Sequence, residues 1–481
     1  MFSQIMLLVT VLAPTLGAFA LPLLGRASLR ARNAVAFGLV AAALAGTACL
    51  IPSAATGHVT TVRLEGPPGL AFVLQADGLA VFMALVSSLV SAVIVLYSTD
   101  YISHYGNQNE YYLMVVLFLG AMMGLVFSGN LILLYVFWEI TAIASWRLIG
   151  FFREKYHVVR ADKAFLVTVF GALAMLLGFI TLYAQTGSFD LAVIKNGLKG
   201  SHLGNFAAAM ILLGILSKSA TLPFHTWLPD AGVAPSPVTA LLHAAVLVKI
   251  GVYVYARLFI VTFSPSPQMQ EVVLIVAAAS AIVSAGAALI ETDLKRIIAY
   301  STVSQIAFIF LGLATGNEMG LVGALLYILM HGLAKGGLFL CAGIVEQGTG
   351  TKDITRLGGL LATMPVTATS FLLCAVSVMG VPPLGGFFSK YMVFSGAIQG
   401  GHGWIAAVFL AGAFLTILYL FRLFNAIFLS SPRMVPAGEG SRLMVACVAL
   451  LAGLSLACGL WIAPSSQLAQ AAVRQMLGAT P

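Results

Sequence analysis

Four ionisable side chains lie inside apolar segments of this chain, where charged residues are rare. Lys218, Lys249 and Lys390 are bases, and Glu139 is the one acid among 16 that lies well inside an apolar run. An ionisable group at the centre of a bilayer helix costs at least about 2.5–3.5 kcal/mol, so it usually faces a partner or a wet cavity. Amines and a carboxylate on separate segments therefore predict a path for ions.

The segment that carries Lys218 should break just after it. Pro223 and Pro229 follow, and a regular helix does not continue through prolines. Non-helical backbone at membrane depth is tolerated only where it is buried in protein or lines a cavity, and broken helices recur in transporters. The alternative is a lysine at a helix end that reaches back to the membrane surface. A second buried lysine, Lys249, argues against that alternative.

Lys249 lies in the middle of its segment, too far from either polar edge to reach water easily. Desolvation disfavours the charged amine, so proton exchange near neutral pH is expected. His243 precedes it in the same segment, and histidine titrates in the physiological range. A core histidine with a satisfied hydrogen bond is the alternative for His243.

His331 and Lys335 are spaced i, i+4 and should share one helix face. Two basic groups so close repel each other if both are charged, which favours one proton between them, as a relay needs. No third ligand lies nearby in sequence, so we predict no metal site.

Lys390 follows Pro382 and Pro383 in a second interrupted span. Two broken helices, each with a buried lysine, predict an internal structural repeat. No residue-level repeat is evident, so this prediction rests on the pattern of breaks.

Glu139 has two interpretations. A carboxylate at depth is either paired with a base or protonated, so Glu139 is either a structural tie between helices or the charge partner of a buried lysine. Arg147 follows near the end of the same segment. It could reach the interface, bind a neighbouring subunit or pair with Glu139, and the last of these would remove the lysine's partner.

Composition places these residues in a membrane protein. Mean hydropathy is +1.02, hydrophobic residues make up 60% of the chain and charged residues 8%, a balance that excludes a soluble domain. A bilayer core of about 30 Å takes about 20 apolar residues per helix. We predict an all-α polytopic fold without strands, forming one membrane domain over 1–481. The first segment lacks a basic leader and should be a span rather than a cleaved signal peptide.

Window hydropathy predicts about fourteen spans. They are 5–24, 33–51, 75–97, 112–128, 130–151, 163–185, 204–222, 237–261, 271–290, 297–315, 319–346, 364–382 continuing to about 398, 404–429 and 442–463. The stretch 52–74 is a polar loop that could form a hairpin, and a short tail follows the last span.

Basic residues are distributed asymmetrically between the loops. The odd-numbered loops carry thirteen, Lys295 among them, and the even-numbered loops with the C-terminal tail carry five, Arg257 among them. By the positive-inside rule the odd loops face the cytoplasm and both termini face outward, in a prokaryotic plasma membrane. The net charge of +8 follows from loop topology plus buried bases, and it is no argument for nucleic acid.

Five cysteines, each in an apolar segment, show no cluster spacing. We expect no electron-transfer centre and no cofactor in this chain, so any redox energy would come from another subunit.

Several stretches resemble the proton-conducting membrane subunit family. They are Phe224–Ala231 followed by Ala234–Val238, Leu241–Lys249, Asp293–Gln305 and Gly385–Lys390. The family includes antiporter-like subunits of complex I, large subunits of Mrp-type Na⁺/H⁺ antiporters, membrane subunits of energy-converting hydrogenases and partners of inorganic-carbon uptake complexes. The resemblance covers about 75–430 and implies fourteen helices with two inverted five-helix repeats, 112–261 and 271–429 here.

The resemblance also implies roles. Glu139 resembles the family's fifth-helix glutamate, Lys218 and Lys390 the lysines of the two broken helices, and Lys249 the lysine of the eighth helix. His243, His331 and Lys335 match its central polar axis. Protons would move along the membrane midplane, gated by the distance between Glu139 and Lys218. The long lateral helix of complex I's largest antiporter-like subunit is expected to be absent.

Four function classes follow. The favoured one is an ion-translocating subunit of a redox-driven complex, of complex I or hydrogenase type. The others are an Mrp-type antiporter subunit, a proton-channel partner of an enzyme that takes up inorganic carbon, and a scaffold without conduction. Expected partners are other membrane subunits, the lipid bilayer, and H⁺ or Na⁺. The residues alone do not choose between the two ions or decide whether the complex is an enzyme.

Overall fold

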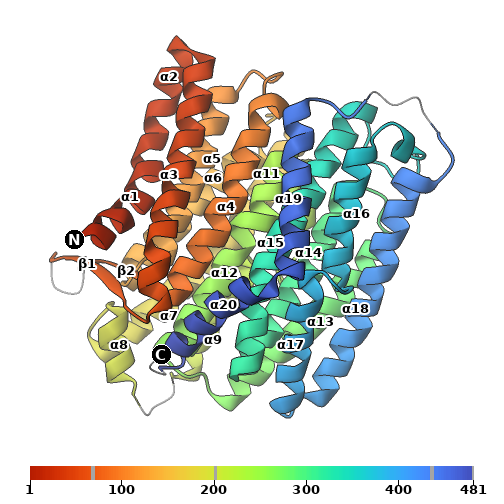
Figure 1. Ribbon diagram of the computed structural model, residues 1–481. Coiled ribbons are helices and arrows are strands. Elements are labelled where there is room, and N and C mark those ends of the chain that lie inside the picture. The colour runs from red at the N-terminus through yellow and green to blue at the C-terminus, as the bar shows by residue number, and fades with distance from the viewer. Residues whose placement is uncertain (67–70, 200–202, 434–437, 479–481) are drawn as a thin grey trace.

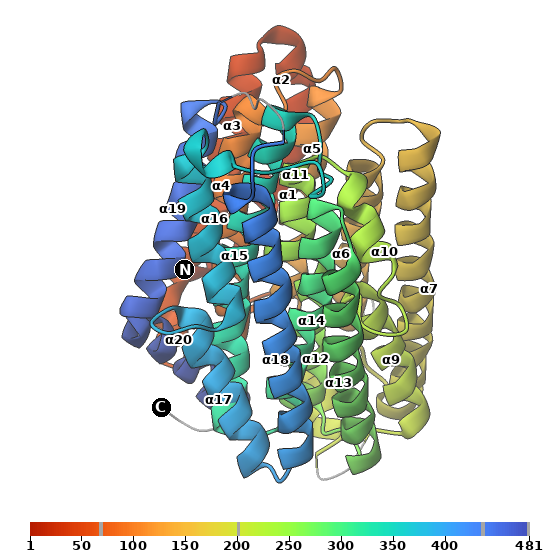
Figure 2. The ribbon, with the colours of Figure 1, turned by 90° about the vertical axis from the view of Figure 1, so that its right-hand side faces the viewer.

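The chain folds into a bundle of long helices that run side by side (Figure 1; Figure 2). This computed structural model describes residues 1–66, 71–199, 203–433 and 438–478. The first half comprises α1 (Phe2–Gly17), η1 (Ala18–Ala20), α2 (Leu21–Ala27), α3 (Leu29–Ala55), β1 (Thr60–Leu64), β2 (Phe72–Ala76), α4 (Gly78–Tyr101), α5 (Gln108–Val126), α6 (Leu131–Ile149), α7 (Lys155–Thr186), α8 (Leu191–Gly197), α9 (Asn205–Lys218), α10 (Trp227–Asp230) and η2 (Ala231–Val233).

The second half begins with a long helix that is irregular in two places. It comprises α11 (Ser236–Ala240), η3 (Leu241–Ala245), α12 (Leu247–Ala256), η4 (Arg257–Thr262), α13 (Pro267–Ile290), α14 (Leu294–Ala314), α15 (Glu318–Thr349), η5 (Leu360–Ala362), α16 (Pro365–Met379), α17 (Gly385–Gln399), α18 (Gly403–Phe424), η6 (Asn425–Leu429), α19 (Arg442–Leu460) and α20 (Ile462–Met476). The segments η3, η4 and η6 are π-helical.

Within the described residues, 12 helical stretches are long and apolar enough to cross a membrane. A helix satisfies its own backbone polar groups, which is what a segment in lipid requires. The prediction of an all-α polytopic membrane protein is confirmed. Two further apolar helices, α9 and α16, are shorter, so the count of fourteen spans stays a prediction.

Polar residues at the ends of the apolar segments set where several helices begin. Asp77 accepts a hydrogen bond from the Ala80 amide at 2.9 Å, and Asn317 accepts one from the Gly320 amide at 2.9 Å. Each side chain satisfies one backbone donor that the first helical turn leaves unpaired. Short polar breaks between apolar runs are therefore enough to define these helix starts.

Both predicted helix breaks are present. Helix α9 ends at Lys218, and α10 begins at Trp227 after an irregular stretch that contains Pro223. Pro229 lies inside the short helix α10 rather than in the break. Helix α16 ends before Gly380, which has a φ of +82°. Pro382 and Pro383 lie between α16 and α17.

Each of the predicted halves, 112–261 and 271–429, contains one of these interrupted helices. Their relation as inverted five-helix repeats stays a prediction.

The polar loop predicted at 52–74 contains the greater part of a small hairpin. Strands β1 and β2 pair antiparallel, with Thr60 opposite Ala76 and Leu64 opposite Phe72. The hairpin lies beside the N-terminus in Figure 1, and residues 67–70, between the two strands, lie outside the described residues. The expectation of no strands is wrong at this place, because the exposed ends of the helix bundle can carry a hydrogen-bonded ribbon.

The C-terminal tail is a helix rather than a short extension. Helix α20 packs on α4 and α15 and crosses the bundle obliquely in Figure 1. Gln475 attaches α20 to the bundle. The Gln475 side chain accepts a hydrogen bond from the Gly78 amide at 2.6 Å and donates one to the Gly57 carbonyl at 3.0 Å. Hydropathy missed this helix because only one of its faces is apolar. The described residues include no long lateral helix.

A buried ion pair joins the start of α4 to the π-helical end of the 236–262 stretch. Arg257 donates from Nη2 to Asp77 at 2.7 Å, and its side chain is only 1% exposed. Arg257 also donates to the Tyr253 hydroxyl at 2.9 Å. The sequence analysis counted Arg257 among the loop bases. That placement is wrong, because the π-helical turn carries the guanidinium into the protein.

We expect Asp77→Ala to destabilise the protein by about 3–5 kcal/mol, because it leaves a buried guanidinium without its counter-charge. Thermal unfolding in mild detergent, followed by fluorescence-detected size exclusion, measures the loss. The matched control is Glu65→Ala, which removes an exposed carboxylate. Equal melting temperatures for the two variants would contradict the assignment.

Candidate functional site

Lys218 lies at the point where the first interrupted helix ends. It is the last residue of α9 and is completely buried. Its amine donates to the Trp138 carbonyl of α6 at 3.2 Å and lies 5.2 Å from the centre of the Trp138 ring. A cation at a helix C-terminus is favoured by the helix dipole. The break thus presents the amine to α6 and not to water.

Glu139 follows Trp138 on α6 and is partly buried. Its Oε1 is shielded from solvent and has no hydrogen-bond partner among the described residues. The carboxyl lies near enough to Lys218 to act on it electrostatically, but the Lys218 amine binds the Trp138 carbonyl instead of the carboxylate. The structure therefore brings the two residues into one neighbourhood without a direct ion pair.

Arg147 pairs with an acid other than Glu139. Its Nε donates to Glu110 Oε1 at 2.7 Å, and Arg153 donates to the other oxygen of the same carboxylate. Glu110 lies in the first turn of α5, so these bonds hold the ends of α5 and α6 together. Of the three interpretations of Arg147, pairing with Glu139 is excluded.

Lys249 lies just after a π-helical turn, where the backbone is irregular. Its amine donates to the Ala244 carbonyl of that turn and is completely buried. It faces Gly332 on α15 so closely that a Cβ at Gly332 would lie 2.8 Å from the amine. Single π-helical turns occur frequently at functional sites. Here the turn and the glycine together place Lys249 against α15, next to His331.

Close packing also joins Lys249's helix to the first break. A Cβ at Gly251 would lie 2.6 Å from the Ile215 carbonyl and 2.0 Å from the Ser219 hydroxyl. Only glycine permits this approach without movement of the α9 backbone. The elements that carry Lys218 and Lys249 are therefore in direct contact.

His243 and His331 are completely buried, and neither ring nitrogen of either residue has a hydrogen-bond partner among the described residues. The His243 ring centre lies 4.4 Å from that of Phe339. Buried polar groups normally find a partner. Two imidazoles whose hydrogen-bonding capacity is not used by the protein are suited to receive and release protons.

Lys335 lies one turn after His331 on α15 and is also completely buried. Its amine donates to two groups on α14, the Ile298 carbonyl at 3.0 Å and the Ser301 hydroxyl at 2.6 Å. His331 and Lys335 therefore lie on the same helix, as predicted, and the Lys335 amine extends to α14.

Lys390 lies in the first turns of α17, after the second break, and is 3% exposed. Its amine donates to the Val378 carbonyl at 2.8 Å, in the last turn of α16. The amine also lies 4.6 Å from the centre of the Phe308 ring and 5.5 Å from that of Tyr327. Both broken helices therefore hold a lysine at the interruption.

Polar residues beyond the predicted set lie between Lys335 and Lys390. Ser301, Gln305, Tyr327 and Tyr419 are buried and hydrogen-bonded to one another. The sequence analysis missed their role because uncharged hydroxyls and an amide do not stand out in apolar segments. The signal that could have found Ser301 and Gln305 is their place in the quoted stretch Asp293–Gln305.

A cluster of ion pairs holds the loop after the first break. Asp230 accepts from Lys163 of α7 at 2.6 Å and from Arg296 of α14 at 2.6 Å. Partial burial raises the pKa of Asp230, but these two cations outweigh that effect and hold the pKa below its usual value. The carboxylate therefore stays charged and fixes α10 between α7 and α14.

Lys295 was predicted as a loop base, but it is buried and paired. Its amine lies 2.9 Å from Glu346 and donates to the Ala234 carbonyl at 2.9 Å. It therefore belongs to the packing of α14 against α15.

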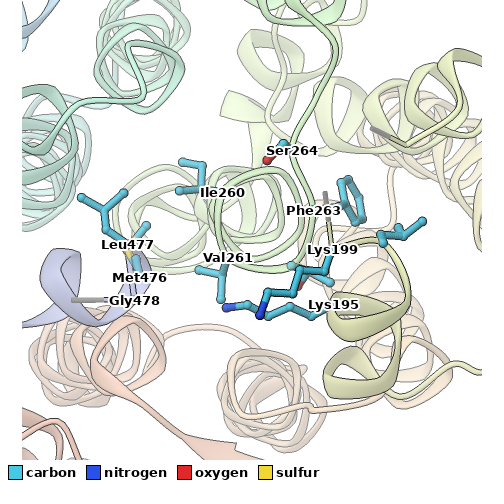
Figure 3. Close-up of a pocket in the computed structure, with 11 residues that line it drawn as sticks. Lys195, Lys199, Ile260, Val261, Phe263, Ser264, Met476, Leu477 and Gly478 are labelled. Carbon is cyan, nitrogen blue, oxygen red and sulfur yellow. The ribbon is translucent and has the colours of Figure 1, made fainter. Parts of the chain in front are cut away.

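A separate cavity of about 540 Å³ opens beside the C-terminal helix (Figure 3). Lys195 and Lys199 lie on one side of it and Met476 and Leu477 on another. None of the predicted site residues lines this cavity, so it is distinct from the row of buried amines.

Two models of known protein families match parts of this chain. A family model described as "NADH:quinone oxidoreductase/Mrp antiporter, TM" matches residues 128–416, more than half of the chain, including all four residues with which the sequence analysis began. A model described as "NADH-Ubiquinone oxidoreductase (complex I), chain 5 N-terminus" matches residues 68–112.

Curated relatives include bacterial antiporter subunits. A Na(+)/H(+) antiporter subunit from Alkalihalophilus pseudofirmus is 39% identical over 365 residues, covering 72% of this chain and 45% of that protein. A probable K(+)/H(+) antiporter subunit from Rhizobium meliloti is 38% identical over 359 residues, covering 73% and 36%. A Na(+)/H(+) antiporter subunit from Staphylococcus haemolyticus is 35% identical over 445 residues, covering 86% and 55%. The chain spans about half the length of the curated relatives it matches.

Solved structures share the fold over nearly the whole chain. A chain of the Mrp complex from Dietzia sp. DQ12-45-1b superposes with a TM-score of 0.89 at 23% identity, covering 98% of both chains. A chain of the membrane-bound sulfane sulfur reductase, an archaeal respiratory membrane complex, gives 0.90 at 23% identity, also over 98% of both chains. A chain of respiratory complex I from Thermus thermophilus gives 0.85 at 24% identity, covering 98% of this chain and 100% of that one.

The predicted resemblance is thus confirmed at two levels, the matched sequence motifs and the helix arrangement. This integral membrane chain belongs to the NADH:quinone oxidoreductase/Mrp antiporter transmembrane family.

Proposed function

We propose that this chain is an antiporter-like subunit that moves protons, or a cation coupled to protons, within a multisubunit membrane complex. The proposal rests on the hydrogen-bond partners of four buried lysine amines. Each donates to a backbone carbonyl, and within the described residues none has a carboxylate in ion-pair contact; they are Lys218, Lys249, Lys335 and Lys390.

Three other lysines of the chain differ from these four because each forms an ion pair with a carboxylate. Lys163 pairs with Asp230, Lys295 with Glu346 and Lys352 with Asp293. A close carboxylate keeps an ammonium charged, whereas a buried charge with only neutral partners is costly. The four amines of the axis are therefore the bases of this protein best suited to gain and lose protons.

The mechanism follows from the order of the groups. A proton on Lys218 is held beside Trp138 and Glu139, and movement of the Glu139 carboxyl changes how well the charge is stabilised. Release toward Lys249 places the proton beside α15, where His331 and Lys335 continue the path to Lys390. The glycine contacts of Lys249 and Gly251 bring these elements together.

The complex has two candidate identities. A redox-driven assembly of complex I or hydrogenase type was favoured from the sequence, and two structural neighbours belong to respiratory complexes. The curated relatives are named as Na(+)/H(+) or K(+)/H(+) antiporter subunits, at 34–39% identity. Their higher similarity favours a cation/proton antiporter assembly. In both cases the partners are other membrane subunits.

The proposed orientation places both termini outside a prokaryotic plasma membrane. It rests on the excess of basic residues in the odd-numbered loops, including the turn between α2 and α3.

We expect Lys249→Ala and Lys218→Ala to abolish ion-coupled proton movement and to leave assembly intact, because each removes one protonatable group from the row. The assay is dye quenching in proteoliposomes that contain the co-purified complex. Lys195→Ala, at an exposed position, is the matched control and should behave as wild type. Normal translocation in both axis variants would overturn the proposal.

A cysteine at Arg30 should react with a membrane-impermeant maleimide only from the cytoplasmic side, and a cysteine at Lys195 only from the outside. Both positions are exposed. Arg30 lies in the first turn of α3 and Lys195 in α8, and the turn between α2 and α3 lies at the opposite end of the bundle from α8 in Figure 1. The five native cysteines are first replaced, and labelling is compared in whole cells and inverted vesicles. The reverse pattern would invert the orientation.

Gentle purification of the chain from its native membrane should yield small antiporter subunits, in keeping with the names of its relatives. Mass spectrometry of the co-purified proteins makes the comparison. Subunits with iron–sulfur ligand spacings would instead assign the chain to a redox-driven complex.

A further inference from the structure

Two of the buried amines are joined by a continuous series of contacts. Lys335 donates to the Ser301 hydroxyl at 2.6 Å, and the Tyr419 hydroxyl donates to the same Ser301 oxygen at 2.8 Å. Gln305 donates to the Thr416 hydroxyl at 3.1 Å and to the Tyr419 hydroxyl at 3.4 Å, and Tyr419 also donates to Thr416 at 3.3 Å. On its other side, Gln305 accepts from the Tyr327 hydroxyl at 2.5 Å. We call these four polar residues, Ser301, Gln305, Tyr327 and Tyr419, the α14–α18 network.

The network ends at Tyr327, beside Lys390. The Tyr327 ring centre lies 5.5 Å from the Lys390 amine, within the range of a cation–π contact. One tyrosine therefore has its hydroxyl in the network and its ring against Lys390. Tyr327, His331 and Lys335 follow one another at i, i+4 and i+8 along α15 and form a single stripe.

The direction of the bonds depends on the charge of Lys335. A charged amine only donates, so the Ser301 oxygen accepts from it and from Tyr419. A neutral amine has a lone pair, and the Ser301 hydroxyl can then rotate to donate to Lys335. That rotation turns the lone pairs of the Ser301 oxygen and so changes the geometry of the bond that it accepts from Tyr419, which can shift toward Thr416. Tyr419 and Thr416 are the acceptors of the Gln305 amide, so their shift changes the orientation of the Gln305 oxygen that accepts from Tyr327.

The network is buried inside the bundle. Ser301, Gln305 and Tyr419 are 0% exposed and Tyr327 is 1% exposed. Burying polar groups costs free energy unless all are hydrogen-bonded, and bonds within such networks reinforce one another. An apolar set of side chains would fill the same space between α14, α15 and α18 without that constraint.

An amide is a poor proton conductor, since its nitrogen donates and its oxygen accepts. The Gln305 link therefore acts through orientation and not through proton hopping. We infer that the α14–α18 network is a positioning device that couples the protonation state of Lys335 to the stabilisation of a charge on Lys390. This inference rests on the proposed function and adds the residues that link its last two bases.

Several titratable groups surround Lys335 and Lys390. Lys390 and Lys335 act electrostatically on each other, and both act on His331 together with Lys249 and His243. Tyr327 and Tyr419 face them from α15 and α18. Uncoupling the two lysines should therefore alter how transport depends on pH, as well as its rate.

The test is Tyr419→Phe in the full chain, assayed as the co-purified complex in proteoliposomes across a range of pH. The change removes one hydroxyl and keeps the ring, so it separates Ser301 from Gln305. We expect a roughly tenfold loss of proton translocation, the scale of one hydrogen bond, and a displaced pH profile. Tyr327→Phe should give the same phenotype.

Tyr97→Phe is the matched control. Tyr97 is equally buried, and its hydroxyl donates to the Leu340 carbonyl of α15 at 3.0 Å, outside the network. Both variants should lose similar thermal stability, but only Tyr419→Phe should shift the pH profile. If Tyr419→Phe keeps the wild-type profile, the network is structural and the inference fails.

The result is separable from the proposed function. Normal transport by Lys249→Ala would reject the translocation axis as a whole. An inactive Lys249→Ala together with a wild-type rate and pH profile for Tyr419→Phe would reject the network alone.

Discussion

The structure depends on one constraint: several amines are held in a dry helix bundle without a close counter-charge. A carboxylate beside each would lock its charge, and exposure to water would let it titrate with no connection to its neighbours. A backbone carbonyl stabilises an ammonium by a hydrogen bond but carries no full negative charge, so it does not hold the amine permanently protonated. Two of the carbonyls that bind the amines lie at helix irregularities, Ala244 in a π-helical turn and Val378 in the last turn of α16 before the second break. The other two, Trp138 and Ile298, lie inside the regular helices α6 and α14, so helix interruptions supply the partner for two of the four amines.

Helix α15 is the element around which this arrangement is built. Of the candidate spans it is among the most buried, with 94% of its most apolar window inside the protein. It carries His331 and Lys335, offers Gly332 to the Lys249 amine, and places Tyr327 under Lys390. A long helix surrounded by protein on all sides can present polar groups to several neighbours without exposing any of them to lipid.

The strong ion pairs lie toward the ends of the bundle. Asp77 with Arg257 anchors the irregular 236–262 helix, and Asp230 with Lys163 and Arg296 anchors the loop after the first break. Such pairs fix the irregular 236–262 helix and the loop of the first interrupted helix in place. The middle of the bundle is then free of paired carboxylates among the described residues, which is the condition that the proposed proton exchange requires.

Much of this protein could be predicted from its sequence, because the relevant signals are local. Long apolar runs predicted the membrane-crossing helices, prolines predicted both breaks, and lysines in apolar surroundings predicted the buried amines. Contacts between distant segments could not be predicted in this way. Arg257 and Lys295 were expected in loops because a charge near the edge of a hydropathy window resembles a loop residue, and α20 was expected as a tail because its polar face lowers its mean hydropathy. The carbonyl partners of the amines, the pairing of Arg147 with Glu110 and the network through Gln305 arise only when helices far apart in the chain pack together, since each hydrogen bond needs a donor and an acceptor from different helices.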